Sequence, residues 1–346
     1  MSRCVLFAII ASILFGASTP FAKLLVGEIS PLMLSGLLYL GSGLGLGITR
    51  IIRDRGWNES ALTRQEWPWL FGAILFGGVL GPVALMFGLT VTNGSTASLL
   101  LNLEAVLTAL IAWIVFRESV NLQVALGMVA IVAGGVVLSW PTEGSKVTDW
   151  IGPFAIAAAC FCWAIDNNLT RKISASDALF IAGIKGLIAG AVNCSLALFL
   201  GIFWPESNVL IATMLVGLLG YGISLVMFVL ALRGLGTART AAYFSIAPFI
   251  GAIVAIILLN ETTPPKFWIA SVLIGIGVWL HLTERHEHEH IHESEKHRHM
   301  HTHDDHHQHE HSPDWNGQEP HDHLHQHTGV VHMHPHFPDI HHRHMH

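Results

Sequence analysis

The sequence predicts an all-α polytopic membrane protein: ten transmembrane helices arranged as two inverted five-helix repeats, followed by a disordered C-terminal tail. Three observations predict this fold class. Of the 346 residues, 52% are hydrophobic and only 12% are charged, whereas about 25% are charged in ordinary soluble domains. Long apolar runs recur at nearly even intervals up to residue 283. All 24 histidines lie at or beyond His281, so residues 284–346 form a second and chemically different part.

The formal net charge of -6 is divided unequally between these two parts. Residues 284–346 contain 4 basic and 12 acidic residues, which leaves 14 basic and 12 acidic residues for 1–283. A nucleic-acid-binding protein concentrates basic residues on one surface. Neither the nearly neutral apolar part nor the acidic tail has that composition, so we expect no nucleic-acid partner.

The apolar runs are expected to be helices because they are long and do not alternate. A helix needs about 20 mostly apolar residues to cross a bilayer, and it satisfies its backbone hydrogen bonds internally. The ten expected spans are 4–26, 30–50, 67–89, 95–116, 121–140, 150–169, 177–203, 208–232, 237–259 and 265–283. The first also resembles a signal peptide, with Arg3 before a short apolar stretch, but the run continues to residue 26 and favours a retained helix.

The positions of Lys and Arg predict the orientation of the spans. With a cytoplasmic N-terminus, ten basic residues face the cytoplasm, and only Lys23, Lys146 and Lys266 face the other side. The ten are Arg3, Arg50, Arg53, Arg55, Arg64, Arg117, Arg171, Lys172, Arg233 and Arg239. An even number of spans returns the chain to the same side. We therefore expect a multi-pass protein of the cell inner (plasma) membrane with both termini in the cytoplasm.

Two internal segments are similar, which predicts a repeat. GSTASLLLNLEAVLTALIAWIVFRE ends at Glu118 and GTARTAAYFSIAPFIGAIVAIILLNE ends at Glu261, while FGASTPFAK at 15–23 loosely matches WAIDNNLTR at 163–171. The offset of 143–148 residues corresponds to five helices, and an odd number of spans inverts the second copy. Inverted repeats recur in secondary transporters, whose substrate sites lie near the midplane where the repeats meet. The expected repeats are 4–140 and 150–283.

These segments resemble EamA-type permeases of the drug/metabolite transporter (DMT) superfamily. The resemblance covers roughly 4–283. It implies a five-plus-five carrier with cytoplasmic termini that imports or exports metabolites, amino acids, nucleotide derivatives or drugs. The sequence departs from the family in the first block, where a proline is usual and this chain has Ala105 preceded by Glu104. The departure predicts that a kink is lost in the fourth span and an acid is gained.

Glu104 is the first candidate binding residue. It lies about ten residues into the fourth span, which places it about 15 Å deep at the rise of an α-helix. Ionisable residues inside a membrane are functional candidates, and a carboxylate that loads and unloads protons suits a proton-coupled carrier. The alternative is a protonated glutamate, or one bonded to Asn102, that only fixes the packing.

Asp166, Asn167 and Lys185 form the second candidate group, at the junction of the sixth and seventh spans. A short loop joins these spans, so Asp166 and Lys185 are expected at similar depth, where a salt bridge would lower the cost of both charges. Such a pair could clamp the hairpin or face the substrate. An unpaired Lys185 could instead bind an anionic group of the solute.

Prolines and glycines inside the spans mark candidate hinges. Pro82 in the third span, and Pro248 with Gly251 in the ninth, could open bends where broken backbone lines a cavity. A tolerated kink without a site is the alternative. Glu118 and Glu261 end the paired blocks and are expected to be interfacial caps or loop contacts.

The tail predicts metal binding, because histidine alternates with aspartate and glutamate in a segment too polar to bury a core. Imidazole suits Zn, Ni, Co and Cu ions. The candidate ligands are His286, His288, His290, His292, His297, His299, His301, His303, His306, His307, His309 and His311. Without fixed spacing, the tail is expected to be a loose multi-site chelator. Incidental affinity of a low-complexity segment is the alternative.

The function predicted from these features is secondary transport of a small metabolite or drug-like solute, driven by an ion gradient. The alternative is a divalent metal transporter, or a metal-regulated carrier, that the tail supplies. A membrane-anchored metal buffer would leave ten helices unexplained, and an enzyme is not expected, because residues 1–280 contain no histidine and the chain no GxSxG motif. We expect the lipid bilayer, a small solute and metal ions as partners, and a homodimer is compatible. No cofactor is required.

Overall fold

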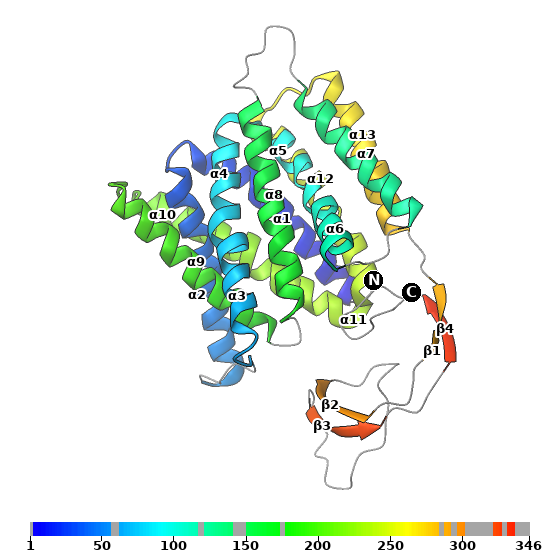
Figure 1. Ribbon diagram of the computed structural model, residues 1–346. Coiled ribbons are helices and arrows are strands. Elements are labelled where there is room, and N and C mark those ends of the chain that lie inside the picture. The colour runs from blue at the N-terminus through cyan, green and yellow to red at the C-terminus, as the bar shows by residue number, and fades with distance from the viewer. Residues whose placement is uncertain are drawn as a thin grey trace. The chain divides into compact units, whose positions relative to one another are not determined.

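The computed structural model describes residues 3–56, 62–116, 121–140, 150–173 and 177–283, together with four short segments of the tail. The chain divides into two compact units, Met1–Glu284 and Arg285–His346. The helices belong to the first unit and the strands to the second (Figure 1).

The first repeat contains five rods of helix, two of which are interrupted. They are α1 (Arg3–Val26), α2 (Pro31–Asp54), a third rod built from α3 (Trp67–Ala73), η1 (Ile74–Leu80) and α4 (Gly81–Val91), a fourth built from α5 (Gly94–Leu100) and α6 (Leu103–Phe116), and α7 (Leu122–Ser139). Ser30 caps α2 with its side chain, and Asn121 caps α7 in the same way. These caps satisfy amides that the first turn of a helix leaves unpaired.

The second repeat follows the same order. Its elements are α8 (Ile151–Arg171), α9 (Ala178–Phe199), α10 (Ser207–Gly217), η3 (Leu218–Ile223), α11 (Ser224–Phe244), α12 (Ala247–Leu259) and α13 (Pro265–Leu282). Eight described helical stretches are long and apolar enough to cross a membrane, and α12 is a shorter apolar helix. α8 has 21 residues but carries the polar run 166–168. The polytopic all-α fold is confirmed.

One expected boundary is wrong. The sequence analysis places a loop between the eighth and ninth spans at 233–236, but α11 continues through these residues to Phe244. No proline occurs between 224 and 247, so nothing removes a backbone donor from the helical ladder there. The interruption comes later, at Ser245 and Ile246.

The irregular segments of the two repeats correspond to each other. The π-helical segments η1 and η3 are separated by about the repeat offset, and so are the two helix breaks, at Leu101–Asn102 and at Ser245–Ile246. π-helical turns are rare and concentrate at functional sites. The recurrence of both irregularities marks the third and fourth rods of each repeat as the specialised parts of the fold.

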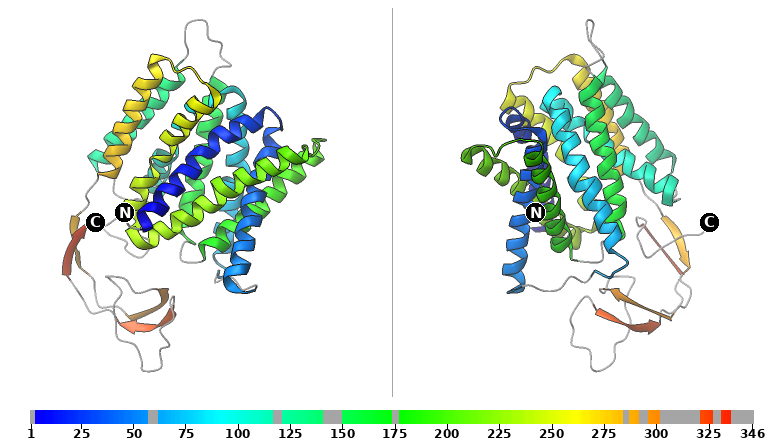
Figure 2. Two further views of the ribbon diagram at one scale, coloured as in Figure 1. Left: turned by 180° about the vertical axis from the view of Figure 1, so that it is seen from behind. Right: turned by 60° about the vertical axis from the view of Figure 1, so that its left-hand side comes forward.

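Close helix contacts join one repeat to the other. α2 packs on α9, α1 on α12, and α7 lies alongside α13 (Figures 1 and 2). At the α2–α9 crossing, a Cβ atom on Gly43 would stand 2.4 Å from the backbone nitrogen of Leu187. Only glycine allows this approach, as is common where membrane helices cross. The repeats therefore share one packed body.

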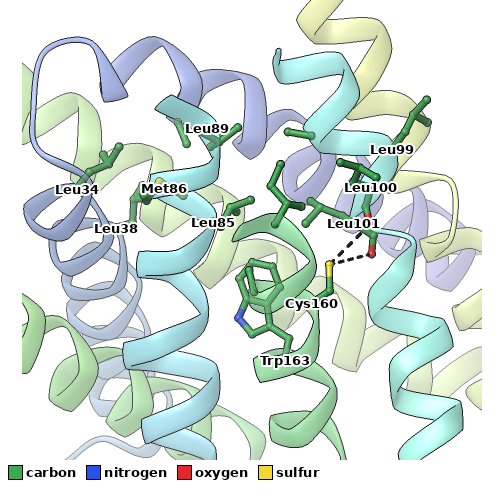
Figure 3. Packing of buried hydrophobic residues seen from close by; sticks show 14 of the residues in the cluster. Leu34, Leu38, Leu85, Met86, Leu89, Leu99, Leu100, Leu101, Cys160 and Trp163 are labelled. Carbon is green, nitrogen blue, oxygen red and sulfur yellow. Dashed lines mark hydrogen bonds between the residues drawn. The ribbon is translucent and has the colours of Figure 1, made fainter. Parts of the chain in front are cut away.

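Buried apolar side chains fill the space between α2, α4, α5 and α8. Leu34, Leu38, Leu85, Met86 and Leu100 belong to one cluster with Cys160 and Trp163 of α8 (Figure 3). This cluster lies next to the break between α5 and α6, so the position of the break depends on tight packing rather than on a loop.

Contacts between helix termini show which loops share an end of the body. Lys266 Nζ donates to Trp140 O over 2.7 Å, and Lys23 Nζ donates to Leu89 O at the same end. At the opposite end, Arg53 binds Asp177. These three basic residues are thus grouped by end as the expected orientation requires, while the cytoplasmic side remains a proposal.

The tail contains four short strands where the sequence analysis expects no fixed structure. They are β1 (Glu287–Ile291), β2 (Lys296–His301), β3 (His321–Gln326) and β4 (Val331–Pro335). β1 pairs with β4 and β2 with β3, both antiparallel. Histidine at every second residue matches the two-residue period of a strand. From the sequence, this spacing is interpreted only as a sign of metal binding and not as a strand.

Candidate solute-binding site

The fourth rod is broken between α5 and α6, immediately before Glu104. Asn102 is buried, and its Nδ2 donates to Leu99 O over 2.9 Å. Cys160 Sγ of α8 lies 3.7 Å from Leu100 O and 4.0 Å from Leu101 O (Figure 3). These side chains interact with backbone carbonyls. In a continuous helix, backbone amides one turn later would bond to those carbonyls. The expected loss of the kink is therefore wrong: the break persists without a proline.

The second repeat is interrupted at the corresponding place, between α11 and α12. Pro248 lies in the first turn of α12, directly after the break at Ser245 and Ile246. A proline is tolerated there because the first amides of a helix have no intrahelical acceptor. One turn further, a Cβ on Gly251 would stand 2.6 Å from Gly16 O. Gly251 thus allows α1 and α12 to touch, and a hinge role for it stays a prediction.

Pro82 of the first repeat has a comparable position. It lies in the first turn of α4, directly after η1. Proline has no amide hydrogen, so it cannot bond the carbonyl one turn earlier, which belongs to Gly78. Asn193 Nδ2 lies 3.5 Å from Gly78 O and 3.4 Å from Val79 O. A buried amide of α9 thereby approaches the Gly78 carbonyl, which the proline leaves unpaired, and the neighbouring Val79 carbonyl.

Glu104 faces a polar group on α8. Asn167 Nδ2 donates to Glu104 Oε1 over 2.8 Å and lies 3.3 Å from Thr108 Oγ1. Asn167 is exposed, whereas Glu104 and Thr108 are partly exposed. Asn102, the alternative partner of Glu104 predicted from the sequence, bonds to the backbone instead. It does not identify Thr108, because a single threonine in a span carries no distinctive signal.

Asp166 and Lys185 form an ion pair between α8 and α9. Their side chains are 7% and 18% exposed, and Thr170 Oγ1 donates to Asp166 Oδ1 over 3.0 Å. The structure therefore brings together the two charges that the sequence places at similar depth. Lys185 is paired, so the alternative of an unpaired lysine that awaits an anion does not apply to this conformation.

The π-helical segment η1 lies against this ion pair. A Cβ on Gly77 would stand 2.0 Å from Asp166 Oδ2. Gly77 O accepts hydrogen bonds from Tyr39 OH over 2.7 Å and from Trp163 Nε1 over 3.0 Å. Neither Tyr39 nor Trp163 is singled out by the sequence. The glycine pair at 77–78, inside an apolar run, is the sequence feature that could have indicated this close approach.

A series of aromatic rings continues from Tyr39 across the body. The ring centroid of Tyr39 is 5.7 Å from that of Tyr221 in η3, which is 6.0 Å from Phe15 of α1. Phe15 is in turn 5.2 Å from Phe244 of α11. Tyr39 OH bonds to Gly77 O, and Asp166 lies against the same glycine. Asp166 and the aromatic rings therefore meet at η1.

The charges of this site do not cancel. Asp166 is matched by Lys185, whereas Glu104 takes part in none of the ion pairs among the residues that the structure describes. Its hydrogen-bond partner, Asn167, is a neutral amide. An ionised carboxylate inside a membrane protein is costly without a counter-charge. The site can therefore accept one proton or one cationic group at Glu104.

Glu261 caps a helix, as the sequence analysis expects. Its Oε1 accepts from Gly94 N over 2.6 Å and its Oε2 accepts from Ser95 N over 2.9 Å, at the start of α5. A carboxylate at this position satisfies unpaired amides and complements the helix dipole. Glu118, the corresponding residue of the first repeat, lies outside the described residues.

An ion cluster joins α2 to α9 at the opposite end. Asp177 Oδ2 lies 3.1 Å from Arg50 Nε and 2.6 Å from one guanidinium nitrogen of Arg53, and Asp177 Oδ1 accepts from Leu179 N over 3.0 Å. Burial raises the pKa of Asp177, but the hydrogen bonds from Arg53 and Arg50 outweigh burial and hold it below its ordinary value. The sequence analysis assigns these arginines only to topology.

A cavity of about 220 Å³ opens beside this ion cluster. Thr49, Arg53 and Asp177 contribute its polar lining, and apolar residues of α11, including Leu225 and Val229, also line it. The cavity therefore lies between α2, α9 and α11, with ionised groups on one side only.

The described residues contain no group of three or more His, Cys, Asp or Glu side chains that could hold a metal ion. Of the candidate tail ligands, His288, His290, His297, His299 and His301 lie in β1 and β2. The other seven lie outside the described residues.

Comparisons with known proteins agree with this architecture. A model of the EamA-like transporter family matches residues 2–140 and 150–283. An uncharacterized transporter of Methanothermobacter thermautotrophicus is 28% identical over 79% of this chain and 84% of its own length. The uncharacterized transporter YyaM of Bacillus subtilis is 25% identical over 77% and 89%. A solved structure, titled only as the crystal structure of a protein, has the same fold, with a TM-score of 0.59, 20% identity, and coverage of 81% of this chain and 96% of that one.

Proposed function

The chain belongs to the EamA-like transporter family, and from this premise we propose that it is a secondary transporter that couples a small organic solute to protons at Glu104. The protein is a membrane transporter by its family and by the names of its relatives. The solute, the driving force and the role of Glu104 are the proposal. The observation that supports it is the uncompensated carboxylate at the break of the fourth rod.

The location of Glu104 suits a transport site. Glu104 comes from α6 of the first repeat and its partner Asn167 from α8 of the second. Inverted-repeat transporters bind their cargo where the repeats meet, beside interrupted helices. Glu104 is the second residue after such an interruption, so movement of α5 against α6 would change its surroundings directly.

The charge of the site suggests how coupling works. When Glu104 is ionised, it attracts a cationic group of the solute, and when it is protonated, that attraction is lost. Proton and cation therefore compete for one carboxylate, and occupancy by either one neutralises the site. A conformational change that costs less with a neutral site would carry one or the other across in turn.

The aromatic rings favour a solute with an apolar part. Tyr39 meets Asp166 at Gly77, its ring contacts that of Tyr221, and Phe15 extends the apolar surface. Aromatic faces attract cations and bury apolar groups. We therefore propose a small organic cation, or a zwitterion that presents its ammonium group to Glu104, as the class of solute.

The test uses purified protein in liposomes that contain a pH-sensitive dye. A panel of organic amines and zwitterions is added outside, and proton movement is recorded. We expect at least one compound to move protons through the wild type and the Glu104→Asp variant, while Glu104→Gln does not couple. Glu261→Gln is the matched control, since that glutamate caps a helix away from the site. Unchanged proton movement in Glu104→Gln would contradict the proposal.

The histidine-rich tail favours a second candidate, in which a divalent metal ion is the cargo and the tail collects it. Cells that lack the gene would be rescued with the full chain or with a chain ending at residue 283. If removal of the tail leaves metal tolerance and intracellular metal unchanged, the metal candidate fails and the organic solute remains. Under either candidate we place the protein in the cytoplasmic membrane with both termini inside, without a required cofactor and without enzymatic activity.

A further inference from the structure

The cavity beside the ion cluster combines apolar walls with a charged end. Its volume is about 220 Å³. Leu46 of α2 and several residues of α11, among them Leu225 and Val229, are apolar lining, while Arg53 and Asp177 bring charge to it. None of the residues that line it belongs to the site around Glu104. The cavity therefore suits an amphipathic molecule other than the transported solute.

The surroundings of the cavity belong to the lipid-facing surface. Leu225, in its lining, is exposed, and so are Ile48 and Ile52 of α2. Exposed apolar side chains of a membrane helix contact lipid tails, which are as apolar as leucine. An apolar cavity offers water few hydrogen-bond partners. A lipid acyl chain is therefore the occupant that its walls favour.

Arg53 has a hydrogen-bond donor available at the charged end. It lies in the last turn of α2, and its side chain is 43% exposed. Its Nε and one terminal nitrogen bond to Asp54 and Asp177 over 2.6–3.1 Å. Among the described residues, its other terminal nitrogen has only a 3.4 Å contact, with Asp177 Oδ1. Since a guanidinium group matches the geometry of a phosphate, this nitrogen suits a phosphate oxygen.

Arg50 allows Arg53 to turn toward such a ligand. Arg50 Nε lies 3.1 Å from Asp177 Oδ2 and 3.6 Å from Asp54 Oδ2, and its side chain is buried. The guanidinium carbon lies 5.0 Å from the ring centroid of Phe180, which holds Arg50 in place. Both carboxylates therefore keep a cationic neighbour while Arg53 shares its donors with a phosphate.

This end of the body carries an excess of positive charge. α2 ends here, α3 begins after the loop that follows it, and α8 ends just before α9 begins. The described residues of these helix ends and loops contain six basic and three acidic side chains: Arg50, Arg53, Arg55, Arg64, Arg171 and Lys172 against Asp54, Glu66 and Asp177. Basic residues at a membrane surface attract anionic lipids. The charge therefore favours an anionic headgroup over a zwitterionic one.

We infer that this cavity binds an anionic phospholipid, with one acyl chain between α2 and α11 and the phosphate on Arg53. The last turn of α2 is where the span ends, so the phosphate lies at the level of the other headgroups. α2 belongs to the first repeat, whereas α9 and α11 belong to the second, so the bound lipid contacts both repeats. The inference holds whichever solute the carrier moves.

The test uses the full-length protein in phosphatidylcholine vesicles that contain a photoactivatable phosphatidylglycerol, with a diazirine in its acyl chain. A phosphatidylcholine probe with the same chain is the comparison, and labelled residues are mapped by mass spectrometry. We expect phosphatidylglycerol to label 46–53 and 225–230 at least about fivefold more than the comparison probe, which corresponds to about 1 kcal/mol for one basic residue at a membrane surface. Val129, exposed on α7, should be labelled equally by both. Equal labelling of the cavity by the two probes would overturn the inference.

A pair of arginine variants tests the phosphate ligand. Arg53→Gln removes it, while Arg55→Gln removes the same charge from an exposed arginine that does not line the cavity. Labelling of the cavity by phosphatidylglycerol is expected to fall at least about fivefold further in Arg53→Gln than in Arg55→Gln. An equal loss in both variants would show that only the surface charge attracts the lipid, and the assigned ligand would be wrong.

A third variant leaves the ion cluster intact. Val229→Trp fills the cavity from α11 without changing its charge, and gel filtration checks that the protein is folded. We expect this variant to lose phosphatidylglycerol labelling at 46–53 and to keep it at Val129. Persistent labelling at 46–53 would overturn the inference. Excess inorganic phosphate should leave the labelling of the wild type unchanged, and displacement by it would show that the site takes free phosphate rather than a lipid.

Discussion

Replacing Lys185 by Met tests whether the ion pair with Asp166 supports the site. The substitution leaves Asp166 with one described side-chain donor, Thr170 Oγ1 at 3.0 Å, in a position where its side chain is only 7% exposed. Removing one partner of a buried pair costs about 3–5 kcal/mol, whereas replacing both partners is often nearly neutral. The 18% exposure of Lys185 places our expectation at the lower end, near a loss of about 3 kcal/mol.

The assay is a double-mutant cycle on unfolding of the purified protein in mixed micelles. Lys185→Met and Asp166→Asn are measured alone and together, with the free energy of unfolding as the readout. We expect the double variant to be more stable than the sum of the two losses predicts, with a coupling of at least about 1 kcal/mol, as for residues in direct contact. A coupling below about 0.5 kcal/mol, the range of independent sites, would refute the pairing argument.

Three further predictions use the same stability assay. Gly77→Ala places a Cβ 2.0 Å from Asp166 Oδ2 and should cost about 1–3 kcal/mol, whereas Gly47→Ala, with no atom within 4 Å of the new Cβ, should be tolerated. Glu261→Gln weakens the cap of α5 and should cost about 1 kcal/mol, and no change would show that the cap is dispensable. Because the pKa of Asp177 is lowered in the folded state, its contribution to stability is present above its unfolded-state pKa and is lost as the pH falls through its folded-state pKa. Asp177→Asn should therefore be less stable than the wild type at neutral pH, and the two proteins should converge in acid.

The correspondence of the two repeats bears on how the carrier could move. Each repeat contains a π-helical segment and, further along the chain, a helix break, and both pairs are separated by nearly the same offset. The contents of the two positions differ: Gly77 of η1 lies against Asp166, while Gly220 of η3 lies against Ser18. The π-helical segment therefore contacts a charged side chain in the first repeat and a hydroxyl side chain in the second. The two repeats thus share a backbone arrangement but differ in the side chains around it. This difference suits a carrier that holds its coupling group in one repeat.

Parts of the site could be predicted from the sequence because depth along a helix depends only on residue number. Glu104 is located by counting from the end of its span, and the short loop between α8 and α9 brings Asp166 and Lys185 to similar depth. Because Glu261 ends an apolar block, the sequence predicts an interfacial cap or a loop contact there, and the structure shows the cap. In each case the rise per residue of a helix supplies the distance.

Other parts could not be predicted because they depend on how each helix is rotated about its axis. Spans that are apolar nearly all round carry little information on which face meets which neighbour. The hydrogen bond from Asn167 to Glu104, and those from Tyr39 and Trp163 to Gly77 O, join helices whose rotation the sequence pattern leaves open. The break at Asn102 was missed because the expectation relied on proline alone.

The sequence by itself predicted the two-part division of the chain, the polytopic helical fold and its two repeats, and the similar depth of Asp166 and Lys185. These follow from local quantities: hydropathy, length and the parity of the span count. Only the tertiary structure decided that Lys185 is compensated by Asp166 while Glu104 has a neutral partner, and that β2 pairs with β3. The reason is physical: pairing between segments far apart in the chain depends on packing and register, which local periodicity constrains but does not select.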